Sequence, residues 1–304
     1  MQRRYNIVER KLTETQDAGG LLTVYVNPDE AERKHLVETL KMDEHTIHSA
    51  LDPDELSRLE FEPDHVAVIY KRPTVYSHEE QFLFQVESSG IFLFKDRLIM
   101  VVGEEVPLSD SSQTFRVTTP VMLLLKLVHR STAHFLAHLK VIASISDSLQ
   151  DKINTSMENR SLIDLFTLEK SLIYYLNSLN SNHMMLDKLK ANAARIGLGA
   201  DEVEFLDDMI IDCGQCYKQA EIYSNILAGL MDARASIVNN NLNQLIKYLN
   251  IITIGIMVPT FVVSAFSMNV GLPLADHPLA FYIVMGLALV SVLGFLSFWR
   301  RKKW

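Results

Sequence analysis

Cysteine is rare in this sequence, and the motifs that mark secretion or catalysis are missing from it. The 304 residues include two cysteines, Cys213 and Cys216, which excludes a disulfide framework and favours a reducing compartment. The opening residues MQRRYNIVERKLTETQ contain no apolar run, so we expect no cleaved signal peptide. The sequence shows no phosphate-binding glycine loop, nucleophile elbow or ordered acid–base pair. It therefore predicts neither an enzyme nor a cofactor.

Charge is nearly absent from the last sixty residues until the chain reaches its end. Residues 245–304 contain Lys247, Asp276 and the four basic residues of the tail RRKKW, a net charge of +4. The whole chain carries −8, which leaves −12 for residues 1–244. An acidic domain argues against binding of that domain to nucleic acid or to anionic lipid, and it is compatible with attracting cations. An ordinary soluble acidic surface explains the same balance.

Two apolar runs near the C-terminus predict two transmembrane helices, Leu245–Met268 and Leu279–Trp299. About twenty helical residues cross a hydrocarbon core of about 30 Å. The second run ends in a tryptophan and a basic cluster, which places that end in the cytoplasm by the positive-inside rule. Both termini are then cytoplasmic, and only residues 269–278 lie outside. The alternative is a buried helical hairpin in a soluble protein. It fits poorly because apolar runs of this length rarely lack charged residues in soluble proteins.

The first predicted span carries a stripe of small polar side chains on one face of the helix. At about 100° per residue, positions separated by three and four residues fall within a single arc. In lipid, such a stripe has to face protein or water. Two interpretations stay open, one in which the stripe joins helices and one in which it forms a pore wall. The second span has no such stripe and is predicted to face lipid. The stripe residues are Asn250, Thr253, Met257, Thr260, Ser264 and Ser267.

Residues 1–115 are predicted to form a mixed α/β domain. A helix is expected from Asp29 to about Met42, and Asp43 is expected to cap a shorter helix ending near Leu51. Turn residues occur at Ser89-Gly90 and Lys95-Asp96. Segments rich in Val, Ile and Phe predict strands at Leu21–Val26, His65–Lys71, Gln81–Glu87, Ile91–Phe94 and Leu98–Val102.

The rest of the chain is predicted to be helical, with helices over 120–157, 159–194 and 201–268. The third helix would be about 100 Å long at about 1.5 Å per residue. From Val203 to Leu245 small and apolar residues alternate by three and four, which indicates a heptad seam that needs neighbouring helices. The predicted organisation is an α/β domain (1–115), a helical region and stalk (116–244), two spans (245–268 and 279–299) around an outer loop (269–278), and a basic tail (300–304).

Three groups of residues have weaker claims to chemistry. Cys213 and Cys216 form a C-x-x-C within a helix, where small core residues are a simpler explanation than metal or redox chemistry. His134 and His138 are spaced i, i+4, a metal-binding geometry, but the sequence supplies no third ligand nearby. The acidic residues of the stalk, more often just a solvated face, are Asp207, Asp208, Asp212 and Asp232.

The membrane region resembles the CorA-type divalent metal ion transporters. Their signature, Gly-Met-Asn at the outer end of the first span, corresponds here to Ser267-Met268-Asn269. The segment LDPDELSRLEFEPDHVAVIYKRP at 51–73 resembles the family's Leu-Asp-Pro motif followed by a strand, and RRKKW resembles its basic tail. Two departures stand out. Ser267 replaces the glycine, and the loop after Asn269 lacks the family's glutamate and is closer to that of the zinc-transporting ZntB branch.

This resemblance implies a homopentamer in an inner membrane of the bacterial type, with the first span of each copy lining a pore. Asn269 would form a ring at the outer mouth, and Asp232 would bind a regulatory Mg²⁺ between subunits. The cargo would be a divalent metal ion, with Mg²⁺, Co²⁺, Ni²⁺ and Zn²⁺ left open. The alternative is a non-conducting membrane-anchored sensor or scaffold on the same fold. The residues implied to line the path below the mouth are Thr260, Met257, Asn250 and Leu249, with Ile246 narrowing its inner end.

Overall fold

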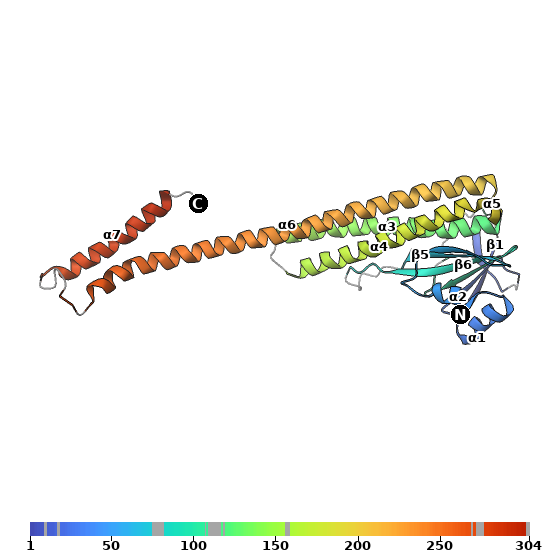
Figure 1. Ribbon diagram of the computed structural model, residues 1–304, viewed down its shortest axis with the longest axis horizontal. Helices are drawn as coiled ribbons and strands as arrows, with labels where there is room; N and C mark the ends of the chain where they lie inside the picture. The colour runs from blue at the N-terminus through green and yellow to red at the C-terminus, as the bar shows by residue number, and fades with distance from the viewer. Residues whose placement is uncertain are drawn as a thin grey trace. The chain divides into compact units, whose positions relative to one another are not determined.

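The chain folds into two units, Met1–Met231 and Asp232–Trp304, in a computed structural model. The boundary falls inside one continuous helix, α6 (Ala200–Phe266), so each unit contains part of it (Figure 1). The structure describes the whole chain except residues 9–10, 17–18, 75–81, 107, 109–116, 118, 156–158, 269, 272–276 and 302–304, and except the side chains of 11, 152–155 and 159–162.

A seven-stranded mixed sheet forms the centre of the first unit. Its strand order is β2-β1-β3-β7-β6-β5-β4, and only the central pair β3–β7 is parallel. Side chains alternate between the two faces because strands have a period of two. The strands are β1 (Gln2–Val8), β2 (Lys11–Glu14), β3 (Leu22–Val26), β4 (Arg58–Phe61), β5 (Val66–Pro73), β6 (Val86–Leu93) and β7 (Leu98–Val102).

Each face of the sheet is covered by a different helical layer, and strand β7 shows the division. Its residues Leu98, Met100 and Val102 join the larger core, which includes α3, α4 and α6, while Ile99 and Val101 join the smaller core. The smaller core includes residues of the π-helix η1 (His35–Thr39) and of α2 (Glu44–Ser49), while α1 (Glu30–Lys34), which precedes η1, has no buried residue. Figure 1 shows these short helices on one side of the sheet and the long helices on the other.

The short helices begin where the sequence predicts. Asp29 forms a capping box with Glu32, in which the Asp29 side chain accepts from the Glu32 backbone and Glu32 reciprocates. The Asp43 carboxylate accepts a hydrogen bond from the Thr46 backbone N–H at 2.9 Å. This bond, the largest of several causes, lowers the pKa of Asp43. The expected helix from Asp29 to Met42 is shorter than predicted and changes to a π-helix at His35.

The predicted turn at Ser89-Gly90 is wrong, because β6 runs through these residues as one strand. Residues 82–85, which were expected to belong to a separate strand, are not in one. Gly90 is needed for a different reason. A Cβ atom at this position would lie 2.7 Å from the Ala50 Cβ, so the glycine allows α2 to approach the sheet. The predicted strand Leu98–Val102 and the turn at Lys95-Asp96 are confirmed.

Three strands escaped prediction, namely β1, β2 and β4. Their sequences, QRRYNIV, KLTE and RLEF, are rich in charged residues and short of the β-branched runs that mark buried strands. Two of them, β2 and β4, are the edges of the sheet, where charged side chains are usual.

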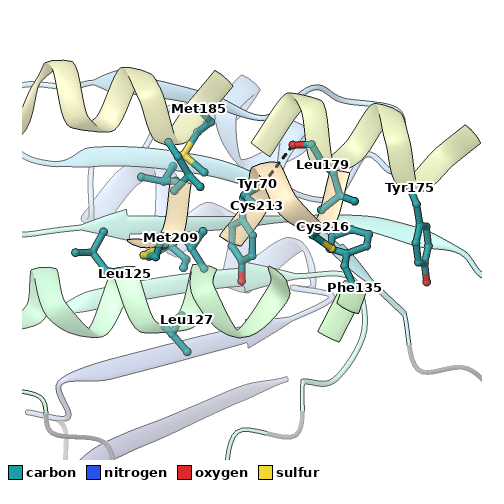
Figure 2. Close-up of a cluster of buried hydrophobic side chains, with 14 of the residues drawn as sticks. Tyr70, Leu125, Leu127, Phe135, Tyr175, Leu179, Met185, Met209, Cys213 and Cys216 are labelled. Carbon is teal, nitrogen blue, oxygen red and sulfur yellow. Dashed lines mark hydrogen bonds between the residues drawn. The ribbon is translucent and has the colours of Figure 1, made fainter. Parts of the chain in front are cut away.

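Three long helices pack together in the first unit, namely α3 (Pro120–Thr155), α4 (Asn159–Ala191) and the first part of α6. The short helix α5 (Ala193–Ile196) follows α4 and ends at Gly197, whose φ of 82° suits glycine. The predicted seam therefore needs a correction. Up to Leu227 its buried members contact α3 and α4 of the same chain, so this part needs no second copy (Figure 2). These members are Leu206, Cys213, Ala220 and Leu227, and their buried neighbours Met209 and Cys216 belong to the same core.

The second unit contains the end of α6 and the helix α7 (Ala280–Arg301), both long and apolar enough to cross a membrane. Pro259 lies inside α6 and lacks the N–H that a helix would bond to the Gly255 carbonyl. The two helices come close at Gly255, where an added Cβ would lie 3.7 Å from the Phe295 ring. A bond of 3.2 Å from the Leu279 N–H to His277 Nδ1 marks the start of α7.

Candidate functional site

Most of the polar stripe of α6 lies on the face of the helix turned away from α7, and at its inner end Asn250 lies beside Trp299 of α7. Towards α7 the half-buried residues Ile251, Gly255, Val258 and Val262 follow steps of four, three and four. The stripe follows the same spacing about 150° further around the helix. All its residues are exposed in the single chain, namely Asn250, Thr253, Met257, Thr260, Ser264 and Ser267. Since the second helix of the unit does not cover them, they are available to water, ions or another copy.

Three hydroxyl groups of the stripe donate hydrogen bonds to their own helix. Thr253 donates to the Leu249 carbonyl at 2.8 Å, Thr260 to the Ile256 carbonyl at 2.7 Å, and Ser267 to the Ser264 carbonyl at 2.9 Å. A hydroxyl has one donor and two acceptor lone pairs. With the donor occupied, each oxygen presents only acceptor capacity outward. Along the stripe these three hydroxyls therefore form a row of hydrogen-bond acceptors.

The other predicted pore residues are apolar and exposed, and they alternate with these acceptors. Met257 is 63% exposed, Leu249 62%, Met268 58% and Ile246 47%. Large apolar side chains exposed at these fractions on a soluble surface are unusual, but they are expected where a helix meets lipid or other helices. Asn269, the residue predicted for the outer mouth, lies outside the described residues.

The stalk acids divide into paired and unpaired groups. The Asp207 carboxylate lies 2.7 Å from Lys190 Nζ, and Asp212 lies 3.1 Å from His129 Nε2. Asp232 is exposed and forms no ion pair within the described part of the chain. It is therefore the stalk acid nearest the stripe that is open to a ligand.

The two other candidate metal sites are occupied by internal contacts. The imidazole rings of His134 and His138 lie 4.3 Å apart, and His138 Nδ1 is 2.6 Å from the Tyr175 hydroxyl. Burial lowers the pKa of His138 to about 4. Cys213 and Cys216 are buried in the core, and burial raises the pKa of both thiols to about 12, which keeps them protonated. Across the residues that the structure describes, no three metal-binding side chains come together.

Sequence reasoning missed two buried cations at the end of the segment 51–73, Lys71 and Arg72 of β5. Arg72 is 7% exposed, pairs with Glu87 at 2.7 Å and donates to the Ser89 hydroxyl at 2.9 Å. Lys71 is 4% exposed, and its ammonium donates to the Pro53 carbonyl and the Ser88 hydroxyl. Burial lowers the pKa of Lys71, while the acidic residues of the loop above it act in the opposite direction. The sequence signal that could have revealed them is the pair Lys71-Arg72 inside the otherwise apolar strand β5.

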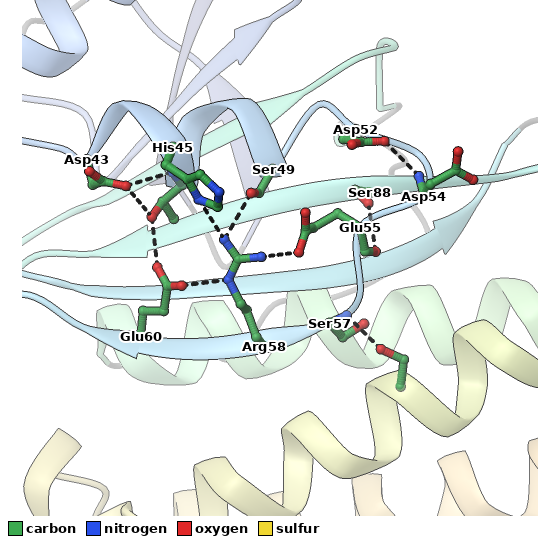
Figure 3. A network of polar contacts seen from close by, with 12 residues as sticks. Asp43, His45, Ser49, Asp52, Asp54, Glu55, Ser57, Arg58, Glu60 and Ser88 are labelled. Carbon is green, nitrogen blue, oxygen red and sulfur yellow. Dashed lines mark hydrogen bonds and ion pairs between the residues drawn. The ribbon is translucent and has the colours of Figure 1, made fainter.

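A neighbouring network, centred on Arg58, holds the loop before β4 (Figure 3). The Arg58 guanidinium donates to Glu60 at 2.6 Å and to the Ser49 hydroxyl at 2.9 Å, and it also pairs with Glu55. The charged residues of this motif are thus used within the chain. Their contacts give the segment 51–73 a structural role, because they hold the loop on the sheet.

Together these features define a membrane protein of the two-span kind, in which a sheet domain and one long helix lead into a pair of apolar helices. A family model described as CorA-like Mg²⁺ transporter protein matches residues 23–303. Because the match covers most of the chain, the protein belongs to this family.

Similar proteins agree with this assignment. The cobalt/magnesium transport protein CorA of Methanocaldococcus jannaschii is 25% identical over 311 residues, covering 98% of this chain and 96% of that protein. The complete structure of the CorA magnesium transporter from the same organism has a TM-score of 0.84 at 24% identity, covering 100% of this chain and 98% of that one. The full-length CmaX protein has a TM-score of 0.74 at 16% identity, covering 100% and 97%. These structures confirm the predicted fold of an α/β domain, a long helix and two apolar helices.

Proposed function

We propose that this protein transports divalent cations, Mg²⁺ or Co²⁺ first among them, through a pore lined by the α6 stripe. The observation that carries the proposal is the row of hydroxyl acceptors on the face of α6 that α7 leaves uncovered. Membership of the CorA-like family and the name of the Methanocaldococcus relative support the cargo. The ion is the substrate, and the mechanism requires no resident cofactor.

The acceptors match the outer surface of a hydrated cation. Water around a cation points its oxygen inward and its hydrogens outward, so the wall has to accept hydrogen bonds. Hydroxyls that have already donated to their own helix do this without reorienting. An anion presents the opposite polarity and finds no free donors on these groups. Because Mg²⁺ loses its waters reluctantly and the stripe contains no carboxylate, we infer that the ion passes hydrated.

The pore requires several copies, and the family resemblance implies five. Each copy would contribute one α6 stripe, with Asn269 forming a ring of amides at the outer mouth and α7 lying outside towards lipid. The basic tail supports a cytoplasmic position for both termini by the positive-inside rule. A membrane potential of about 100 mV then favours entry of a divalent ion by roughly 4.6 kcal/mol. Native mass measurement in detergent should show a pentamer, and a monomer or dimer would contradict this arrangement.

We infer that the apolar side chains along the pore close it. Rings of Met257 and Leu249 side chains exclude water when they approach each other, which blocks a hydrated ion. Asp232 would hold a cytosolic divalent ion between subunits and so offset the repulsion of five acidic domains. Loss of that ion would let the subunits separate and the apolar rings widen.

The first test is flux of Mg²⁺ into liposomes that contain the purified protein. Asn269→Ala should lower the flux more than about tenfold while the assembly stays intact, because a methyl group neither donates to nor accepts from the ion's waters. Undiminished flux would place the filter elsewhere. Repeating the assay with Co²⁺, Ni²⁺ and Zn²⁺ ranks the cargo ions, since oxygen acceptors favour hard Mg²⁺ and the outer loop resembles that of a zinc transporter.

The acceptor row is tested by Thr260→Val, which keeps the shape of the side chain and removes its oxygen. We expect a several-fold lower flux. Ser291→Ala is the matched control, because the Ser291 hydroxyl donates to the Ala288 carbonyl at 2.7 Å in the same way but lies on α7. Equal losses in both variants would show that the effect comes from helix stability rather than from the pore wall.

A second candidate function is a non-conducting membrane-anchored sensor. It is favoured by Ser267, which replaces the glycine of the family signature and bonds its own helix at Ser264. Single-channel recording and liposome flux separate the two functions, because a sensor shows no current and no flux under any metal gradient.

A further inference from the structure

A groove between α6 and α7 lies at the end of the second unit that carries the basic tail. It encloses about 340 Å³, and its lining is mainly apolar. The Lys247 ammonium lies 6.0 Å from the centre of the Trp299 ring, so the two helices meet here through a cation and an aromatic face. The remaining lining residues are Asn243, Ile246 and Asn250, and the last two lie where this side of α6 meets the stripe.

The described charged residues around this groove are basic, namely Lys247, Arg300 and Arg301. Among the described residues, no ion pair involves Lys247, Arg300 or Arg301. The acids of residues 232–304 are Asp232 and Asp276. Asp232 is about 22 Å from Lys247 along the helix at about 1.5 Å per residue, and Asp276, which lies outside the described residues, is 29 positions from Lys247 in the sequence. The two further basic residues of the tail strengthen the imbalance.

We propose that this groove binds an anionic phospholipid, with the phosphate near Lys247 and Arg300 and the glycerol and acyl chains against Trp299. Basic pockets between transmembrane helices at the cytoplasmic surface suit anionic headgroups. A tryptophan at the same level has an apolar ring and a polar N–H, which fits the boundary between headgroup and chain. A zwitterionic lipid brings its own cation and leaves the three basic side chains without a net countercharge.

The occupant is a lipid rather than a soluble anion because of where the groove lies. The groove lies beside α7, whose residues up to Trp299 carry no charge, and the surface it presents is mainly apolar although its α6 wall includes Lys247 and two asparagines. A free phosphate would satisfy the basic groups but leave this apolar lining exposed to water. A phospholipid pairs its phosphate with the basic groups and covers the apolar lining with its chains. The acidic first unit, by contrast, offers nothing to an anionic surface.

Fluorescence of Trp299 tests the proposal directly. The chain has two tryptophans, so Trp304→Phe leaves Trp299 as the only one. The full-length variant is placed in phosphatidylcholine vesicles with a minor share of phosphatidylglycerol, and bromine is carried on the chains of one lipid or the other. We expect brominated phosphatidylglycerol to quench Trp299 more than an equal mole fraction of brominated phosphatidylcholine. High salt should reduce the difference.

Lys247→Gln in this background should lower the preference for phosphatidylglycerol about fivefold, the factor corresponding to one basic residue near an anionic surface. Lys247→Arg should keep it, and Lys188→Gln, an exposed lysine of the first unit, serves as the control. Equal quenching by both lipids would overturn the proposal. So would a preference that survives Lys247→Gln, since the tail alone would then attract the lipid, or an absence of quenching by either lipid, since a neighbouring copy would then fill the groove. None of these readings depends on metal transport.

Discussion

The two ends of helix α6 carry the same spacing of three and four residues but use it in different ways. Between Leu206 and Leu227 the spaced residues are apolar or small and are buried against α3 and α4. Between Ile246 and Ser267 the spaced residues are polar or large and stay exposed. A periodic pattern shows that a helix has a special face, but it does not show what covers that face. In the first unit the chain covers it, and in the second unit something outside this chain has to.

Hydrogen bonding follows the same division. In the first unit Asn182 is 1% exposed and joins α4 to the sheet, because its Oδ1 accepts from the Lys71 backbone N–H and its Nδ2 donates to the Lys71 carbonyl, both at 2.8 Å. In the second unit the stripe hydroxyls bond only to the helix that carries them. Substitutions in the first unit should therefore change stability, and substitutions along the stripe should change transport.

The largest expected effect on stability is that of Asn182→Ala. It leaves the buried Lys71 N–H without its partner and removes one of two bonds to the Lys71 carbonyl, which keeps the Ser131 hydroxyl at 2.7 Å, so the free energy of unfolding should fall by about 2–4 kcal/mol. Chemical denaturation of the full chain measures it, with exposed Asn180→Ala on the same helix as the control. Flux per assembled transporter should not change. A selective loss of flux at unchanged stability would break the division between the two units.

Gly90→Ala should cost about 1–3 kcal/mol, because the new methyl group would lie 2.7 Å from the Ala50 Cβ and would force α2 away from the sheet. Gly103→Ala is the matched control, since the nearest atom to a Cβ there is the end of the Glu87 side chain at 3.9 Å. Thermal unfolding compares the two variants. If they unfold at the same temperature, the close approach of α2 is not what requires the glycine.

Acid should destabilise the first unit through His138. Burial holds its pKa at about 4 in the folded chain, compared with about 6.5 when unfolded, so the unfolded chain binds more protons between these values. The contribution of neutral His138 to the free energy of unfolding is then fully present above about pH 6.5. It falls by an amount on the order of 1–3 kcal/mol as the pH drops towards 4. His138→Asn should flatten the dependence of the unfolding midpoint on pH, and exposed His35→Asn should not. Identical pH profiles for both variants would remove His138 from this role.

The smallest effect is expected for Asp232→Asn, which should shift or flatten the inhibition of flux by internal Mg²⁺. Removing the charge weakens both the repulsion between copies and the proposed metal site, so the direction of the shift is left to the measurement. Asp208→Asn, another exposed acid of α6, is the control. Overlapping curves for wild type and Asp232→Asn would make Asp232 an ordinary surface residue.

Local properties of the sequence determined much of this protein. The lengths and the lack of charge of two runs predicted the apolar helices, and α6 begins and ends within two residues of the prediction. The caps at Asp29 and Asp43 were readable because a side chain and the backbone three residues later form them. The spacing of the stripe was readable for the same reason, since every member lies on one helix.

Only the tertiary structure decided which groups meet across the chain. The glycine at 90 resembles a turn signal until α2 is seen against it, and the seam of α6 is ambiguous until α3 and α4 cover its first part. The bonds of Asn182 to Lys71 span 111 residues, and the groove at Lys247 exists because Trp299 returns to it from another helix. Such contacts depend on how distant segments pack, and a pattern within one segment contains no information about its partner.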